Sequence, residues 1–195
     1  MSKFRMLAKE KILLAIASKV TNKIAVIRSD RRGVAAIEFS LFVGMLAFGL
    51  LNTADVSIYI YQRMELENAA QMGAQAAWQT CDPNNNQLPA TTNCPGLTTA
   101  ITNAIQSTSL GTNVALQSGS PAEGYYCVNS SNALQYVSAV SSKPADCTAA
   151  GMPSLQPADY IQITTTFPYA PLFPGITVAS GFTTPITQTA LMRLD

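Results

Sequence analysis

The sequence predicts an α+β protein in which a long N-terminal transmembrane α-helix packs against a small antiparallel β-sheet domain. Three observations support this prediction. An apolar run at residues 34–51 follows a basic segment, the chain has no proline before Pro83, and short strand-like runs follow residue 112. Residues 1–33 carry nine basic and two acidic side chains, a net charge of +7, whereas the rest of the chain carries −6. This asymmetry indicates two compartments.

The apolar run has the length and flanks of a membrane span. It contains 18 residues with Glu38 as its only charge, and at about 1.5 Å per residue it reaches close to the ~30 Å thickness of the hydrocarbon core. A buried helix of a soluble core is the alternative, but such helices are usually shorter. The basic residues ahead of the span predict a cytoplasmic N-terminus and an exported remainder. A cleaved secretory signal peptide fits less well, because it requires a shorter apolar core and a small-x-small exit site.

Glu38 needs an explanation, because a charged side chain at a helix centre in the bilayer costs on the order of 2.5–3.5 kcal/mol on insertion scales. One interpretation is an interfacial acid near the cytoplasmic end of the span. The other requires a cut between Gly33 and Val34, which would create an α-amino group and make Glu38 the fifth residue. Neighbouring helices could then pair one chain's amine with another chain's carboxylate.

The stretch "RRGVAAIEF" resembles the class III leader junction of type IV pilins and pseudopilins. It has basic residues, Gly33 before the cut, Glu38 five residues after it and then an apolar helix. The pair Glu38-Phe39 is closer to the Flp and Tad branch. The stretch "NTADVSIYIYQRMELENAAQMGAQAAW" is similar to the juxtamembrane helix of TadE-like pilus-assembly proteins, and residues 160–195 are similar to their ending. The resemblance covers roughly residues 30–80 and 158–195.

The resemblance implies a TadE-like minor pilin or pseudopilin that acts in Tad/Flp pilus assembly or tight adherence. It would be anchored in the bacterial inner membrane, with a periplasmic C-terminal domain or a place in an extracellular pilus. A prepilin peptidase would cut between Gly33 and Val34, and Glu38 and Phe39 would act in assembly. The implied partners are the inner membrane, this peptidase, other pilin or pseudopilin subunits and the Tad secretion machinery. The alternative is an uncleaved single-span envelope protein with an exported interaction domain.

All four cysteines follow the apolar run, an arrangement typical of disulfides in an oxidising compartment. Buried free thiols are the alternative, and zinc is less supported because the chain has no CxxC and no histidine. Four cysteines allow three connectivities. We favour the local pairs Cys81–Cys94 and Cys127–Cys147, because each closes a turn-rich loop.

The expected organisation is a basic cytoplasmic leader (1–33), a transmembrane and extended helix (34–80) and an exported domain (81–195). Small residues after residue 68 would let a sheet or another helix approach the extended helix closely, and Trp78 is expected to be a core anchor. A turn-rich loop (81–96) and a second helix (97–110) follow. Strands are expected at residues 113–119, 124–129, 133–140, 159–167 and 185–194.

The composition argues against an enzyme. Without histidine, Ser-His-acid and Cys-His arrangements cannot form, and the sequence contains no phosphate loop and no dinucleotide fingerprint. We therefore expect no catalytic residues, no metal, no cofactor and no small-molecule substrate. Nucleic acid is not expected as a partner either, because the basic block lies outside the folded domain.

Overall fold

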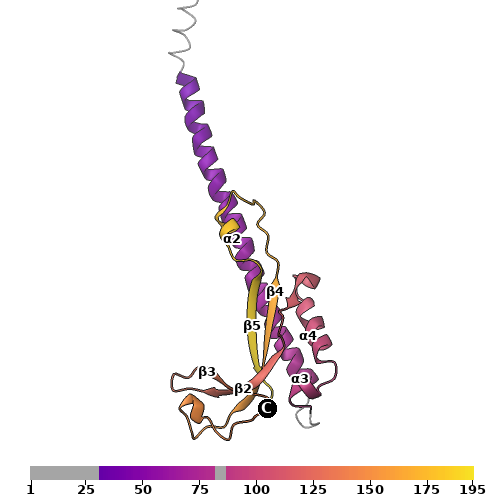
Figure 1. Ribbon diagram of the computed structural model, residues 1–195. Coiled ribbons are helices and arrows are strands. Elements are labelled where there is room, and N and C mark those ends of the chain that lie inside the picture. Colours follow the sequence, from indigo (N-terminus) through magenta and orange to yellow (C-terminus); the bar gives the residue numbers. More distant parts are fainter. Residues whose placement is uncertain (1–30, 82–86) are drawn as a thin grey trace, which may run out of the picture. The chain divides into compact units, whose positions relative to one another are not determined.

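The computed structural model describes residues 31–81 and 87–195 and has an α+β architecture, as the sequence predicts (Figure 1). The leader is assigned to residues 1–33, of which residues 1–30 lie outside the described ranges. The helices are α2 (Arg31–Thr80), α3 (Ala90–Asn93) and α4 (Leu97–Gln106). The strands are β1 (Ala115–Leu116), β2 (Ala122–Val128), β3 (Leu134–Ala139), β4 (Ala158–Phe167) and β5 (Ile186–Arg193), and single 3₁₀ turns η2 (Gly111–Asn113), η3 (Thr148–Ala150) and η4 (Val178–Gly181) interrupt the loops.

The five strands form one antiparallel sheet with β4 at its centre. β5 pairs with β4 along its whole length, from Tyr160 opposite Arg193 to Phe167 opposite Ile186. The other edge of β4 is shared by β2 at its beginning and by β1 at its end, and β3 pairs only with β2. All five predicted strand regions contain a strand, although β1 is much shorter than predicted.

The face of β4 that packs against α2 is apolar. Burial alternates along the strand, as the two-residue period of a β-strand requires, so that Ile161, Ile163, Thr165 and Phe167 are all buried. The Thr165 hydroxyl lies 3.3 Å from the backbone carbonyl of Leu66 on α2 and donates a hydrogen bond to it. α4 covers the next part of α2 and contributes buried Ile101 and Ile105 to the same core.

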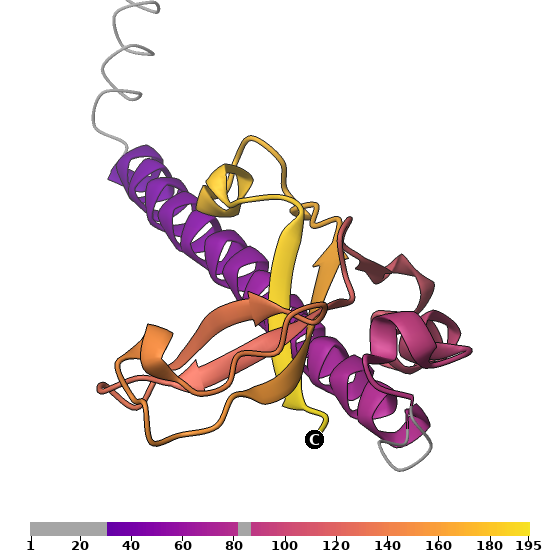
Figure 2. The same cartoon turned by 60° about the horizontal axis from the view of Figure 1, so that its bottom comes forward.

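α2 meets the sheet through small residues, as the sequence predicts. The buried positions follow helical spacing, at which residues three or four apart share a face, and comprise Leu66, Ala69, Ala70, Ala74 and Ala77. Gly73 is the closest approach: a Cβ at this position would lie 2.8 Å from Cγ2 of Ile105 and 3.2 Å from Cγ2 of Ile163. Figure 2 shows β4, β5 and α4 beside this part of α2.

The prediction that Trp78 anchors the core is wrong, because 52% of its surface is exposed. Trp78 follows the buried Ala77 by one residue, and one residue turns an α-helix by about 100°, so its side chain leaves the buried face. Tyr61 and Met64 are also exposed and therefore do not belong to the face that meets the sheet.

Residues Leu51–Asp195 form one compact unit, separate from the described residues before Leu51. The boundary between these units lies inside α2, because the second half of α2 supplies core residues to the sheet. The functional division expected at residues 33 and 80 stays a prediction. We call the unit Leu51–Asp195 the sheet domain.

Replacing Gly73 by valine tests this close contact. The new side chain must displace the three isoleucines that surround position 73, namely Ile101, Ile105 and Ile163. We therefore expect a loss of unfolding free energy of about 1–3 kcal/mol from overpacking. Gln75→Val is the control, since Gln75 is exposed on the same helix and valine there meets no packed neighbour. Helix propensity alone favours valine over glycine and disfavours valine relative to glutamine, so a larger loss at position 73 must come from packing. Urea unfolding of the detergent-solubilised chain, followed by circular dichroism, measures both. Equal destabilisation of the two variants would contradict the contact.

Candidate functional site

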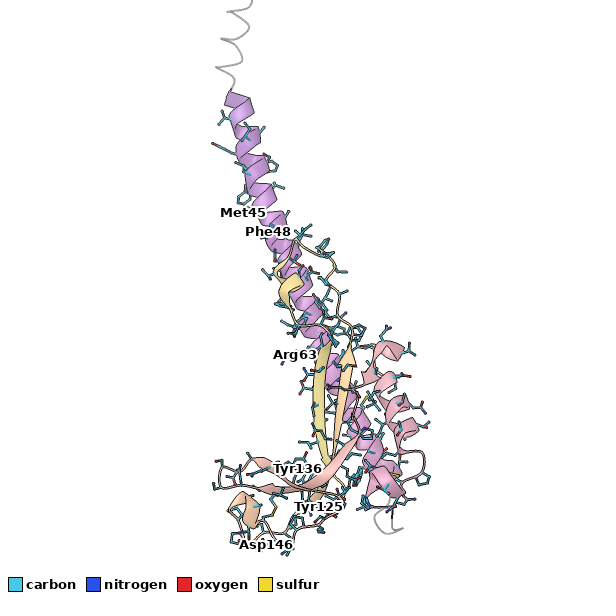
Figure 3. The ribbon with its side chains drawn as sticks, viewed as in Figure 1. Met45, Phe48, Arg63, Tyr125, Tyr136 and Asp146 are labelled. Atoms are coloured by element: carbon cyan, nitrogen blue, oxygen red, sulfur yellow. A yellow bond between two sulfur atoms is a disulfide. The ribbon has the colours of Figure 1, made fainter. Side chains whose placement is uncertain are left out.

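The first part of α2 is a candidate membrane span. Within the described ranges, it is the one helix long and apolar enough to cross a membrane. Its large apolar side chains are exposed among the described residues: Phe39 is 69% exposed and Met45 is 78% exposed. Figure 3 shows the side chains of Met45 and Phe48 projecting from the helix.

The predicted cleavage and assembly residues lie near the start of α2. A Cβ built on Gly33 would meet no atom within 4 Å, and Val34 is 57% exposed. Glu38 and Phe39 are exposed as well. The bond between Gly33 and Val34 is therefore accessible, but it is helical rather than extended. The functional roles of these four residues stay predictions.

Asp55 forms a buried anchor that the sequence reasoning missed. Its side chain is fully buried. Its Oδ1 accepts a hydrogen bond from the Leu172 N–H at 2.8 Å, and its Oδ2 accepts bonds from the Phe173 N–H at 3.3 Å and from the Thr177 hydroxyl. One turn earlier, the side-chain oxygen of Asn52 accepts a bond from the Val178 N–H at 2.9 Å. Asn52 and Asp55 thus hold the loop 171–178 against α2.

The Asp55 carboxylate is adapted to burial. Burial alone would raise the pKa of the Asp55 carboxyl, but the hydrogen bonds from Thr177, Leu172 and Phe173 outweigh it and hold the pKa below its ordinary value. The side chain is therefore ionised at neutral pH with its charge satisfied. An aspartate soon after the span is the sequence signal for this anchor, but its partners lie more than a hundred residues later in the chain.

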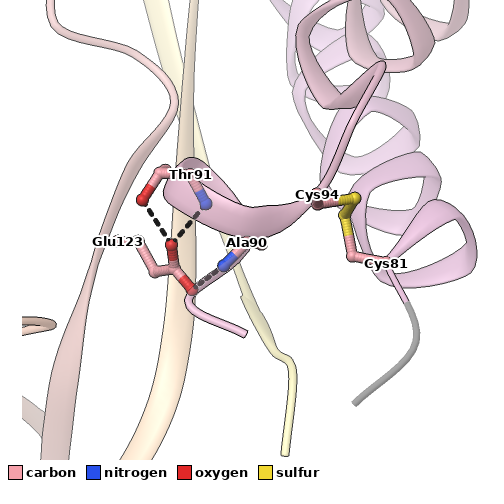
Figure 4. Close-up of a disulfide and its surroundings, with 5 residues drawn as sticks. All are labelled: Cys81, Ala90, Thr91, Cys94 and Glu123. Carbon is pink, nitrogen blue, oxygen red and sulfur yellow. Dashed lines mark hydrogen bonds between the residues drawn. A yellow bond between two sulfur atoms is a disulfide. The ribbon is translucent and has the colours of Figure 1, made fainter. Parts of the chain in front are cut away.

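The first disulfide joins the end of α2 to the loop that follows α3 (Figure 4). Cys81 and Cys94 are bonded, as the sequence analysis favours. Beside them, the Glu123 carboxylate on β2 accepts hydrogen bonds from the N–H groups of Ala90 at 2.6 Å and Thr91 at 2.7 Å, and from the Thr91 hydroxyl at 2.5 Å. The start of α3 is thereby fixed to the sheet, and its end is fixed to α2.

The second disulfide, Cys127–Cys147, is the other pair that the sequence analysis favours. It connects β2 to the long loop between β3 and β4. With Ala150 it forms a small apolar cluster separate from the main core, against which Val137 and Met152 pack. In the entropy model, closing loops of these lengths contributes roughly 3 kcal/mol each.

Asp159 at the start of β4 is a buried acid in a negative environment. Its side chain is 3% exposed, and its backbone N–H donates a bond to Oδ1 of Asp195 at 2.9 Å. Burial, the negative charges of Glu123 and Asp195, and a hydrogen bond with Glu123 raise the pKa of Asp159 to about 7, while Lys143 acts in the opposite direction. Asp159 therefore carries a proton below neutral pH.

Two features of the described residues bear on ligand binding, namely metal-ligating groups and a pocket. Between residues 31 and 81 and from 87 onward, no group of three or more histidine, cysteine, aspartate or glutamate side chains is placed to hold a metal ion. A shallow pocket beside the first disulfide contains no titratable side chain; it is lined by Thr91, Cys94, Gly96, Leu97, Thr98, Thr99 and Pro121.

The family comparison identifies the segment that carries these features. Residues 33–75 match the model of the TadE-like protein family. The match confirms the predicted resemblance over this segment, whereas the resemblance predicted for residues 158–195 stays a prediction. The matched segment includes Glu38, Asn52, Asp55 and the first small residues that meet the sheet. Comparisons with curated proteins and with solved structures find no match. The match covers less than half of the chain, and its likeness to TadE-like proteins suggests a Tad pilus-associated protein with a candidate membrane helix.

Replacing Asp55 by asparagine should loosen the loop 171–178. The amide has one acceptor oxygen in place of two, so at least one of the three donors loses its partner. We expect faster hydrogen exchange at the Leu172 and Phe173 amides and a lower melting temperature. Because the folded pKa of Asp55 lies below its ordinary value of 3.8, this stabilisation is present above about pH 4 and is lost as the pH falls.

Asp146→Asn is the control for this variant, since the Asp146 carboxylate binds only its neighbour Thr148. It should leave exchange in the loop 171–178 unchanged. Unchanged exchange in Asp55→Asn as well would contradict the anchor.

Asp159 should give the sheet domain a pH dependence of the opposite sign. Between about pH 4 and pH 7 the folded state holds a proton on Asp159 that the unfolded state has lost, so stability falls as the pH rises through this window. Asp159→Asn resembles the protonated acid and should remove this dependence. Melting temperatures of both proteins from pH 4 to pH 8, measured by circular dichroism, should agree at the acid end and diverge as the pH rises, with the variant more stable. Parallel curves would show that Asp159 titrates normally.

Proposed function

We propose that this protein is a TadE-like minor pilin or pseudopilin that acts in Tad/Flp pilus assembly or tight adherence. The observation that carries the proposal is the TadE-like match over residues 33–75, the segment that contains both the apolar run and the anchor of the sheet domain. Its partners are the inner membrane, other pilin or pseudopilin subunits and the Tad secretion machinery. Its role is structural rather than enzymatic, consistent with a chain that has no histidine.

In this proposal α2 crosses the bacterial inner membrane once, with residues 1–33 in the cytoplasm and the sheet domain in the periplasm. The charge asymmetry across the apolar run supports this orientation. The two disulfides also support it, because disulfides persist in the oxidising periplasm and are rare in the cytoplasm.

A prepilin peptidase then cuts between Gly33 and Val34. The exposed start of α2 supports access to this bond. The cut creates an α-amino group on Val34, and the Glu38 carboxylate of a neighbouring subunit pairs with it in the low-dielectric helix bundle. Phe39, exposed beside Glu38, supplies apolar contact area to the same neighbour.

A second candidate is an uncleaved single-span envelope protein whose sheet domain binds a partner. The helical conformation at Gly33 favours it, because a peptidase requires an extended substrate bond. Glu38 is then an interfacial acid near the cytoplasmic end of the span.

Two substitutions separate these functions. Gly33→Ala should leave insertion intact but slow or block processing, because alanine strengthens the helix at the cut by about 1 kcal/mol. Glu38→Val should leave processing intact and lose assembly, because the neighbour's amine has no partner. The mass of the mature N-terminus and recovery with sheared pili measure the two steps.

Matched controls are Gly44→Ala and Glu67→Val. Gly44 has equally open surroundings, and Glu67 is an exposed glutamate later on α2, so both variants should behave like the parent. A full-length parent N-terminus beginning at Met1 would favour the uncleaved anchor. Assembly of Glu38→Val at the parent level would reduce Glu38 to an interfacial acid.

A further inference from the structure

The loop between β4 and β5 exposes apolar side chains to an unusual degree. Leu172 is 60% exposed, Ile176 56% and Val178 62%. No charged residue occurs anywhere between Tyr160 and Met192. The long loop between β3 and β4, in contrast, carries Lys143 and Asp146. Exposed apolar side chains that gather in one uncharged loop are typical of a contact with a partner or a membrane.

The loop is held at a defined level along α2. Asn52, the first residue after the apolar run, binds the N–H of Val178, and Asp55 binds those of Leu172 and Phe173. At 1.5 Å per residue, Asp55 lies about 6 Å along the helix axis beyond Leu51. The interfacial layer of a bilayer is roughly 5–8 Å thick on each side. If the apolar run spans the hydrocarbon core, the loop lies in this layer.

The loop also meets the hydrogen-bonding requirement of that layer. Where water is scarce, backbone N–H groups must find partners within the protein. Pro171 and Pro174 have no N–H. Every other N–H from residue 171 to residue 178 has an internal acceptor: Asp55 for residues 172 and 173, the Ser180 hydroxyl for 175, the Phe173 carbonyl for 176 and 177, and Asn52 for 178.

We propose that the loop 171–178 inserts Leu172, Ile176 and Val178 into the interface of the lipid bilayer that α2 crosses. The inference rests on the proposed membrane insertion of α2. The loop contacts lipid rather than protein, for three reasons. It is bound to Asn52 and Asp55, which follow the apolar run directly in the sequence, it lacks charge, and its backbone donors all have partners. Asp55 and Asn52 are then the residues that position the sheet domain at the membrane surface.

Tryptophan fluorescence of the full chain in phosphatidylcholine vesicles tests the proposal. The chain has one tryptophan, and Trp78→Phe removes it at an exposed site. Ile176→Trp is then introduced singly, with Leu134→Trp as the matched control. Leu134 is an exposed leucine on β3, a strand far from the loop in both views (Figures 1 and 2). Val43→Trp in the apolar run reports on insertion of α2 itself.

The tryptophan at position 176 should emit at shorter wavelength than the one at position 134. Lipids brominated near the glycerol backbone should quench it, whereas the tryptophan at position 134 should be quenched little. Val178→Trp should reproduce the result if Ile176→Trp does not fold, and intact disulfides together with resistance to protease identify the folded variants.

Two results would overturn the proposal. In the first, the tryptophan at position 176 has the same emission and quenching as the one at position 134, while lipids brominated near the chain ends quench the tryptophan at position 43. This result would show an inserted helix with a water-exposed loop. A shielded tryptophan at position 176 that becomes exposed as the protein is diluted in lipid would show that a second copy covers the loop. Absence of quenching at position 43 would contradict the proposed membrane insertion, and the inference with it.

Discussion

The close contact between the small-residue face of α2 and strand β4 is the interaction on which the sheet domain depends. β4 is the centre of the sheet, and its buried residues face α2 and α4. Gly73 sets the separation, since even a Cβ there would lie 2.8 Å from Ile105 and within 3.3 Å of Ile163 and Ile101. The first disulfide and the Glu123 bonds then fix α3 to this centre. The sheet therefore could not form its core without the second half of α2.

This arrangement gives one helix two different surroundings. The second half of α2 is stabilised by packing against protein. The first half has exposed apolar side chains and needs an apolar solvent, which a bilayer supplies. Asn52 and Asp55 lie where the two halves meet and hold a loop from the far end of the chain. In the proposed function, this junction couples the membrane anchor to the domain that meets other subunits.

Local patterns in the sequence were sufficient to predict the apolar run, the small-residue face and the strand regions, because each follows a fixed period along the chain. Local loop lengths also favoured both disulfide pairs. Long-range partners were not accessible in this way. Asp55 accepts hydrogen bonds from residues 172–177, and Asp159 is buried beside Glu123 and Asp195. Neither contact produces a repeating pattern in the sequence. Trp78 was misplaced because its size suggested burial, whereas its position one residue beyond Ala77 determines its exposure.

Hydrogen exchange along α2, measured by mass spectrometry on the full chain in lipid nanodiscs at increasing urea, tests the central claim most directly. If the two halves of α2 have different surroundings, amides after Asp55 should lose protection together with those of β4 and β5. Amides of residues 38–51 should stay protected at the same urea concentration. Loss of protection along the whole helix in one step would contradict this account. So would continued protection of residues 60–80 after the sheet has unfolded.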